Sequence, residues 1–149
     1  MAYGNMTEGK GYVRIEGKIL SFPMGAVKIY EGSCVFADSQ GKAVFTPIEG
    51  SPFLGVSLET KDNTSDTGKK IRVFTEGCFE FTGTGFTGAD LGKTVYLDLS
   101  ADPNTVTTTK PATAGDLCIP IGKIMRALSG DKIFVKIDGF AMREDTVKI

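Results

Sequence analysis

The amino-acid sequence predicts an all-β fold: a small, glycine-punctuated β-barrel or β-sandwich with an extended N-terminal arm. Apolar residues do not recur at the roughly 3.6-residue spacing of a helix, while short runs rich in β-branched and aromatic residues occur throughout. Turn-forming residues separate these runs at intervals of about ten residues. Glycine accounts for 19 of the 149 residues and follows no collagen-like period, so tight turns are expected at many of these positions.

Ten runs carry the composition of β-strands. Gly, Pro, Asn or Asp lies between successive runs and supplies the backbone angles that turns require. The segment "SGDK" directly before the last run predicts a tight hairpin. One helical turn is predicted at 87–93, with Thr87 as its N-cap and Gly92 as its C-cap. The ten predicted strands are residues 26–30, 33–37, 42–47, 53–59, 70–75, 78–82, 93–99, 105–109, 121–128 and 132–138.

Two stretches, "YEGSCVF" and "TEGCFEF", nearly repeat each other. Each places a glycine between two predicted strands, Gly32 in the first and Gly77 in the second, where a bulge or turn needs a residue without a Cβ atom. Alternation after Gly77 puts Cys78 and Glu80 on one face of the strand and the two phenylalanines on the other. The repeat is therefore interpreted as architecture rather than as a reactive cysteine motif.

Residues 23–149 are predicted to form a single β domain, which suits a chain of this length. Residues 1–22 are set apart as an N-terminal arm or an added edge strand, because "MAYGNMTEGK" has little strand character whereas "GYVRIEGKIL" has the composition of a strand. The arm carries apolar anchors that it could not bury by itself, so we expect them to contact a partner. These anchors are Met1, Tyr3, Met6 and Tyr12.

The segment "TGTGFTG" at 82–88 is rich in glycine but lacks the Lys-Ser/Thr pair of a phosphate-binding loop. Phe86 is the one large apolar residue in it. An aromatic ring in such a loop either packs into the core or contacts a partner. The sequence leaves both alternatives open.

The sequence contains no set of residues that is typical of a catalytic site. The chain has no histidine, which removes the commonest general base and nitrogen ligand. Cys34, Cys78 and Cys118 are far apart and form no Cys-x-x-Cys pair, so we expect reduced, buried side chains rather than zinc ligands or nucleophiles. The sequence therefore predicts a protein that is not an enzyme and holds no cofactor or metal.

Two loops, 61–70 and 98–104, concentrate carboxylates. Their oxygens could bind calcium, or a pair of them could act as acid and base. Neither loop has the spacing of the twelve-residue calcium loop with its closing glutamate, so solvated turns are favoured. The residues concerned are Asp62, Asp66, Asp98 and Asp102.

Charge and hydropathy narrow the range of partners. The chain has 17 Lys and Arg against 18 Asp and Glu, a net charge of −1, whereas nucleic-acid-binding proteins commonly show a basic excess. No direct nucleic-acid partner is therefore expected, although charges could still segregate on the folded surface. No stretch approaches the roughly 18 apolar residues that cross a bilayer, and the N-terminus lacks the parts of a secretory signal, so we expect synthesis in the cytoplasm and no membrane partner.

Several segments together resemble a known family. "VKIYEGSCVFAD", "FLGVSLET", "IRVFTEGCFEF", "GKTVYLD" and "IPIGKIM" resemble the small capsid decoration (cement) proteins of tailed bacteriophages and their head-fibre-like domains, and more loosely the lambda-type head decoration protein. The resemblance covers about residues 25–138. It implies a virion protein on the capsid exterior, made in the host cytoplasm. It also implies a homotrimer that bridges major capsid protein subunits and has no catalytic residues.

Two other classes of function stay open. One is a β-barrel binding module for carbohydrate or another ligand, such as a head-fibre or host-attachment component. Such modules use exposed aromatic platforms, and the chain has no tryptophan and four tyrosines. The other is an enzyme built on the acidic loops, which loss of activity on chelation would reveal.

Overall fold

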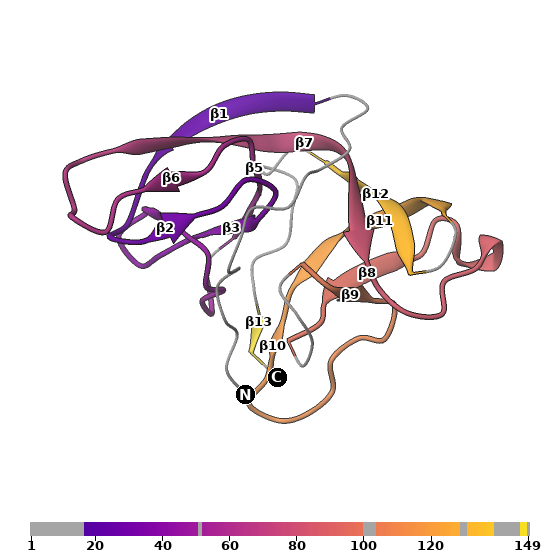
Figure 1. Cartoon of the computed structure of the whole chain (residues 1–149). Helices are drawn as coiled ribbons and strands as arrows, with labels where there is room; N and C mark the ends of the chain where they lie inside the picture. The colour runs from indigo at the N-terminus through magenta and orange to yellow at the C-terminus, as the bar shows by residue number, and fades with distance from the viewer. Residues whose placement is uncertain (1–16, 51, 100–103, 129–130, 139–146, 149) are drawn as a thin grey trace.

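The chain is nearly all β in the computed structural model, which describes residues 17–50, 52–99, 104–128, 131–138 and 147–148. The predicted fold class is confirmed (Figure 1), and the described residues contain one short 3-10 helix, η1 (Gly88–Asp90). The strands are β1 (Gly17–Pro23), β2 (Lys28–Ile29), β3 (Cys34–Ala37), β4 (Ala43–Val44), β5 (Phe53–Ser57), β6 (Lys61–Asp62), β7 (Lys70–Thr82), β8 (Thr94–Leu97), β9 (Val106–Thr107), β10 (Leu117–Cys118), β11 (Pro120–Ala127), β12 (Lys132–Ile137) and β13 (Val147–Lys148).

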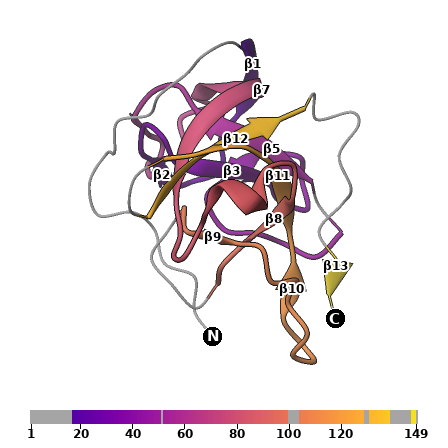
Figure 2. The ribbon, with the colours of Figure 1, turned by 90° about the vertical axis from the view of Figure 1, so that its right-hand side faces the viewer.

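Nine strands form one sheet in the order β4-β3-β5-β7-β12-β11-β8-β9, with β1 paired to β7 beside this path. All of these strand pairs are antiparallel. A parallel bridge joins Thr82 at the end of β7 to Thr105 next to β9. The second half of the sheet therefore curls back on itself as a half-barrel (Figure 2). Two small sheets, β2–β6 and β10–β13, complete the fold.

β7 is the central strand of the molecule and runs unbroken for 13 residues. Its first part lies between β1 and β5, since Phe74 pairs with Ile19 of β1 and with Val56 of β5. Its second part pairs with β12. The prediction of two strands separated at Gly77 is wrong. Gly77 adopts a φ of 148°, which glycine tolerates and other residues rarely adopt, so the backbone bends there while the strand continues.

Two turns lie where the sequence predicts them. Gly32 adopts a φ of 84° between β2 and β3. Thr87 is the N-cap of η1, because its hydroxyl accepts a backbone N–H of the first turn and its own N–H donates to the Asp90 carboxylate at 2.8 Å. The C-cap is Leu91 rather than the predicted Gly92. Gly92 follows with a φ of 80°, as the residue beyond a helix end often does.

Buried apolar side chains form two clusters. The larger one fills the curled half of the sheet and continues under β3 and β5. The smaller one gathers side chains from β2 to β5 and from the start of β7. On β3, Val35 belongs to the smaller cluster and its neighbours Cys34 and Phe36 to the larger one. Because successive residues of a strand face opposite sides, this part of the sheet is buried on both faces.

The N-terminal segment is described only from residue 17. Residues 17–23 form β1, so the described part of the predicted arm is an edge strand on β7. β11 and β12 pair antiparallel, and the Leu128 N–H donates to the Lys132 carbonyl at 2.9 Å, as a hairpin at "SGDK" requires. Across the described ranges, no helix has the length and apolar character to cross a membrane.

Candidate interaction surfaces

The loop that follows β6 is built from local hydrogen bonds. One carboxylate oxygen of Asp62 accepts the Thr64 hydroxyl at 2.7 Å and the Thr64 N–H at 2.9 Å. The hydroxyl first, then the N–H and the charges of Lys28 and Lys69, hold the pKa of Asp62 below its usual value. This carboxylate is therefore used to close a turn, in agreement with the interpretation from the sequence.

The other acidic residues singled out in the sequence lie in two loops. Asp66 adopts a φ of 51° in the same loop. Asp98 follows β8 and lines a pocket described below, and Asp102 lies outside the described residues. In the part of the chain that the structure describes, no three His, Cys, Asp or Glu side chains are grouped so that they could hold a metal ion.

All three cysteines are buried, as predicted, and no disulfide joins them in the part of the chain that the structure describes. Around the first Gly-Cys repeat, the Asn104 side chain makes two backbone contacts. Its amide nitrogen donates to the Gly32 carbonyl, and its oxygen accepts the Cys34 N–H at 3.0 Å. These bonds tie the segment before β9 to the start of β3. They give this repeat a structural role.

Of the five residues predicted to contact a partner, the structure describes only Phe86. Met1, Tyr3, Met6 and Tyr12 lie outside the described residues. Phe86 is only 9% exposed and belongs to the larger core cluster. Of the two alternatives left open by the sequence, its ring packs into the core and is not presented on the surface. The ring lies against Gly83, where a Cβ atom would come within 2.0 Å of Phe86 Cε2.

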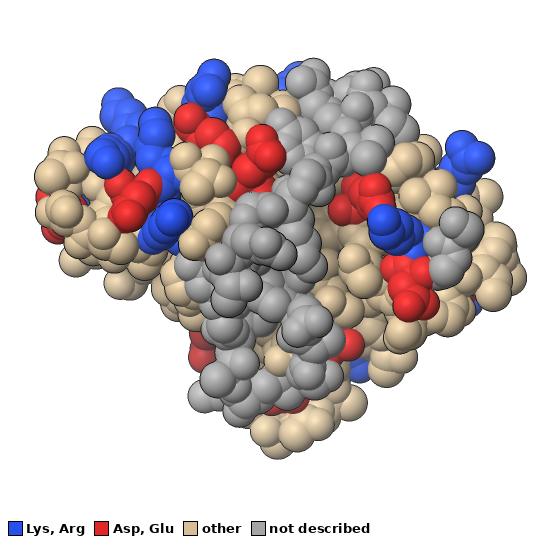
Figure 3. All heavy atoms as spheres, in the orientation of Figure 1, with Lys and Arg blue, Asp and Glu red and all other residues tan. Residues whose placement is uncertain are grey.

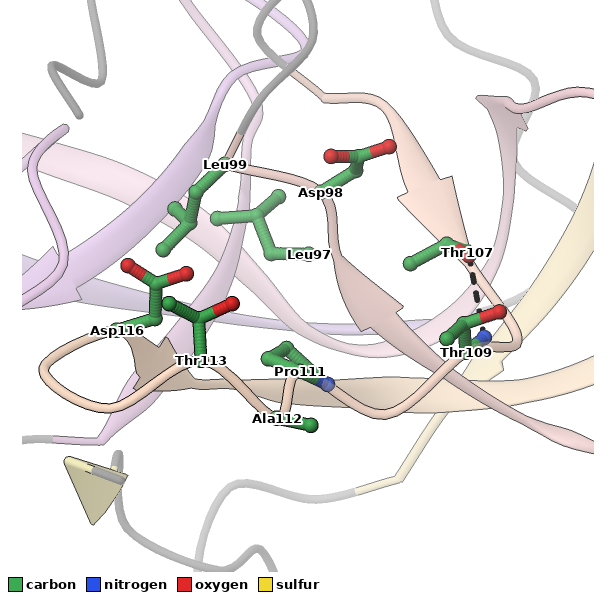
Figure 4. A pocket seen from close by; sticks show the side chains of 9 residues that line it. All are labelled: Leu97, Asp98, Leu99, Thr107, Thr109, Pro111, Ala112, Thr113 and Asp116. Carbon is green, nitrogen blue, oxygen red and sulfur yellow. Dashed lines mark hydrogen bonds between the residues drawn. The ribbon is translucent and has the colours of Figure 1, made fainter.

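A pocket of about 320 Å³ opens beside the end of β8 (Figure 4). Leu97 and Leu99 supply its apolar part, and the loop 109–116 closes the opposite side, with Thr113 and Asp116 next to each other. None of the nine described residues that line it is aromatic. The pocket therefore lacks the flat ring on which a sugar or a base would stack.

Four large apolar side chains stand out as exposed among the described residues, and they occupy two places. Ile19 and Leu20 lie in the middle of β1 and are 43% and 45% exposed; Leu91 and Met125 are 63% and 52% exposed. The second pair lies on adjacent segments, because the N–H of Gly92, after Leu91, donates to the carbonyl of Ile124, before Met125, at 2.8 Å. Ile19 and Leu20 are successive residues of one strand, so their side chains face opposite sides of β1.

A third surface, around β2, β6 and the start of β7, carries mixed charge (Figure 3). Glu59 is its centre: it accepts the Arg72 N–H at 3.0 Å and the Arg72 Nε at 3.3 Å, with Lys61 Nζ at 3.7 Å. Burial acts to raise the pKa of Glu59, but the hydrogen bonds from Arg72 and both positive charges outweigh it and lower the pKa. Glu59 thus balances part of the charge of Arg72 and Lys61 on this surface.

The exposed apolar residues were not among the predicted contacts, although the sequence contains a signal for one of them. In "IGKIMRAL", Ile124 and Met125 are adjacent, and two neighbours cannot both face the core from a regular strand. With Ile124 in the core, alternation alone leaves Met125 outside, and the β-bulge between Ile124 and Arg126 turns Arg126 to the same side as Phe134. No protein-family model matches the chain, and no curated protein matches it either.

Proposed function

We propose that this chain is a capsid decoration protein of a tailed bacteriophage. It binds the outer surface of the mature head as a homotrimer and bridges neighbouring major capsid protein subunits. In this proposal it is a structural component of the virion and not an enzyme. The resemblance of its strand and glycine pattern to that family motivates the proposal, and the β architecture and near-zero net charge are compatible with docking onto protein.

The observation that carries the proposal is the outer edge of β1. Among the described residues, β1 pairs with β7 only. Proteins commonly protect such an edge with charges, bulges or proline. Here Lys18, with a bulge beside it, and Pro23 stand at the two ends, while the exposed Ile19 and Leu20 occupy the middle. An edge of this kind can accept a strand of a partner, with main-chain hydrogen bonds for affinity and apolar side chains for fit.

A trimer makes this edge more effective. Three copies of one edge, linked in one particle, bind with an effective concentration that a monomer lacks, so modest contacts add up to tight binding. The pocket beside β8 gives less support to a carbohydrate-binding module, because its described lining has no aromatic ring. Surface docking is the function that these features support best.

The test mixes purified protein with mature heads of the phage whose genome encodes it, prepared without this protein. Electron microscopy should show added trimeric density at threefold or quasi-threefold positions. The double variant Ile19→Lys with Leu20→Lys should bind about tenfold more weakly, because edge lysines oppose strand addition. Ala26→Lys with Gln40→Lys, which adds the same charge at exposed turn positions, is the control. Bare heads at saturating protein would overturn the proposal.

A further inference from the structure

The outward face of β11 and β12 concentrates positive charge, although the whole chain has a net charge of −1. Alternation along β12 buries Ile133, Val135 and Ile137 and leaves Lys132, Phe134 and Lys136 on the other side. The ladder places Lys123 of β11 opposite Lys136, and Arg126 of β11 opposite Phe134. We call this set the β11–β12 face: Lys123, Met125, Arg126, Lys132, Phe134 and Lys136.

Carboxylates balance part of this charge. On the β7 side, Glu80 pairs with Phe134 in the ladder and accepts Lys132 Nζ at 3.2 Å. The exposed Asp131 and Asp138 lie at the two ends of β12. Lys136 is engaged in an interaction of its own, so the argument rests on Lys123 and Arg126, both exposed.

The side chains of Lys123 and Arg126 are both exposed and belong to one strand, on either side of the bulge. Around Glu59, by contrast, Lys61 and Arg72 share a carboxylate of the chain itself. We therefore look for the partner of Lys123 and Arg126 on another molecule.

Apolar groups lie among the cations. The bulge turns Arg126 to the side of Phe134, and the preceding residue, Met125, is 52% exposed. Leu91, 63% exposed, lies on the adjacent segment, where the Gly92 N–H donates to the Ile124 carbonyl. Half-buried Phe134 sits between Arg126 and Glu80 in the ladder. Met, Arg and aromatic residues are the types enriched at protein–protein interfaces, whereas phosphate-tracking surfaces rely on basic residues alone or on aromatic rings open to stacking.

We propose that the β11–β12 face docks onto an acidic protein surface, with Lys123 and Arg126 meeting carboxylates around the apolar contact of Met125 and Leu91. The inference rests on the proposed function, and it names the chemistry of the capsid surface that the protein meets. In that setting the β11–β12 face and the edge of β1 are two separate contacts of one protomer.

The first experiment does not need capsids. The probe is immobilised polyglutamate, eluted with a salt gradient, and the variant is Lys123→Glu with Arg126→Glu. Lys70→Glu with Lys110→Glu is the matched control, since it changes the net charge equally at exposed sites outside this face. The patch variant should elute at clearly lower salt than the control. Elution of both variants together would overturn the proposal, as would stronger retention of the unchanged protein on duplex DNA than on polyglutamate at the same salt.

The second experiment uses the heads described above. At low salt the patch variant should bind about tenfold more weakly than the control, and the difference should shrink toward about 0.5 M salt, where screening acts over only a few ångströms. Met125→Ala should weaken binding at every salt concentration, because apolar contacts are not screened. Circular dichroism melts confirm that each variant is folded.

The two proposals fail separately. If heads bind the unchanged protein and the patch variant equally, this inference is wrong and the decoration function stands. If heads bind neither but polyglutamate distinguishes patch from control, the decoration function is wrong and the acidic partner must be sought elsewhere.

Discussion

At the scale of single residues, glycines mark where one backbone lies against another. Gly55 of β5 adopts a φ of 147°, and a Cβ atom there would lie 2.0 Å from the Phe74 carbonyl oxygen. Neither the angle nor the space allows a side chain. Gly122 of β11 has the same steric problem, with a Cβ atom 2.2 Å from the Lys136 carbonyl oxygen.

We therefore expect Gly55→Ala to lower the free energy of unfolding by about 2 kcal/mol or more, from backbone strain and steric conflict together. Gly88→Ala is the matched control, because a Cβ atom there meets nothing within 4 Å, and it should change stability by less than about 0.5 kcal/mol. Urea denaturation followed by circular dichroism measures both. Equal stability of the two variants would show that β5 and β7 do not approach as described.

Glu59 makes stability depend on pH. Its pKa in the folded protein lies below its usual value of 4.5, so the unfolded chain takes up a proton more readily. The stabilisation from Glu59 is therefore fully present above about pH 5 and is lost as pH falls through the folded pKa. Glu59→Gln should reduce stability at pH 7, and its difference from the unchanged protein should vanish in acid. Glu49→Gln, which replaces an exposed carboxyl group outside this network, is the control. If the loss of stability in Glu59→Gln does not depend on pH, the expectation is wrong.

At the scale of elements, β1 joins the predicted arm to the sheet. Seven residues of β1 pair with β7, and Phe22 packs against the smaller core cluster. Deleting residues 2–23 should lower the free energy of unfolding by about 2–5 kcal/mol, from lost ladder hydrogen bonds and apolar burial. Deleting residues 2–11 should leave the protein folded but weaken binding to heads, because this segment carries two of the four predicted apolar anchors, Tyr3 and Met6. Unchanged binding by the shorter deletion would show that the arm is not an anchor.

The positions of most strands along the chain were predictable, because each predicted strand has an apolar run with turn residues at its ends. The prediction of a break at Gly77 was wrong, because the sequence does not distinguish a glycine that bends a strand from one that ends it. β6 and β10 span two residues each. Pairs of this length are set by their partners in space, and no period of the sequence reveals them.

The candidate surfaces were less predictable than the strands. The exposure of Ile19 and Leu20 depends on which edge of β7 the strand joins. The cations of the β11–β12 face come from two strands and are brought together by the register of the hairpin. The sequence predicts the alternation of Lys132, Phe134 and Lys136, but the bulge that sets Met125 and Arg126 relative to them depends on how Ile124 packs.

At the scale of the whole molecule, the two core clusters share β7. Val73 contributes to the smaller cluster and Phe74, the next residue, to the larger one. The rings of Phe74 and Phe79 lie 5.4 Å apart on either side of the bend at Gly77. A strand common to both clusters cannot leave one without disturbing the other, which favours a single unfolding unit over two.

We predict that the protein unfolds in one transition despite its two clusters. Ile71→Ala removes a fully buried side chain from the smaller cluster and should lower the free energy of unfolding by about 2–5 kcal/mol. If β7 couples the clusters, that loss shifts the whole transition to lower urea with its slope unchanged. Far-UV circular dichroism reports the sheet. Tyrosine fluorescence in a background with Tyr3, Tyr12 and Tyr30 replaced by Phe reports Tyr96 in the curled half, away from the substitution. Ile133→Ala, in the larger cluster, is the counterpart and should shift both signals equally. In Ile71→Ala, the first half of the sheet could unfold at lower urea while the Tyr96 transition keeps its midpoint. That result would mean that the two halves fold independently and that the bend at Gly77 is a hinge between them.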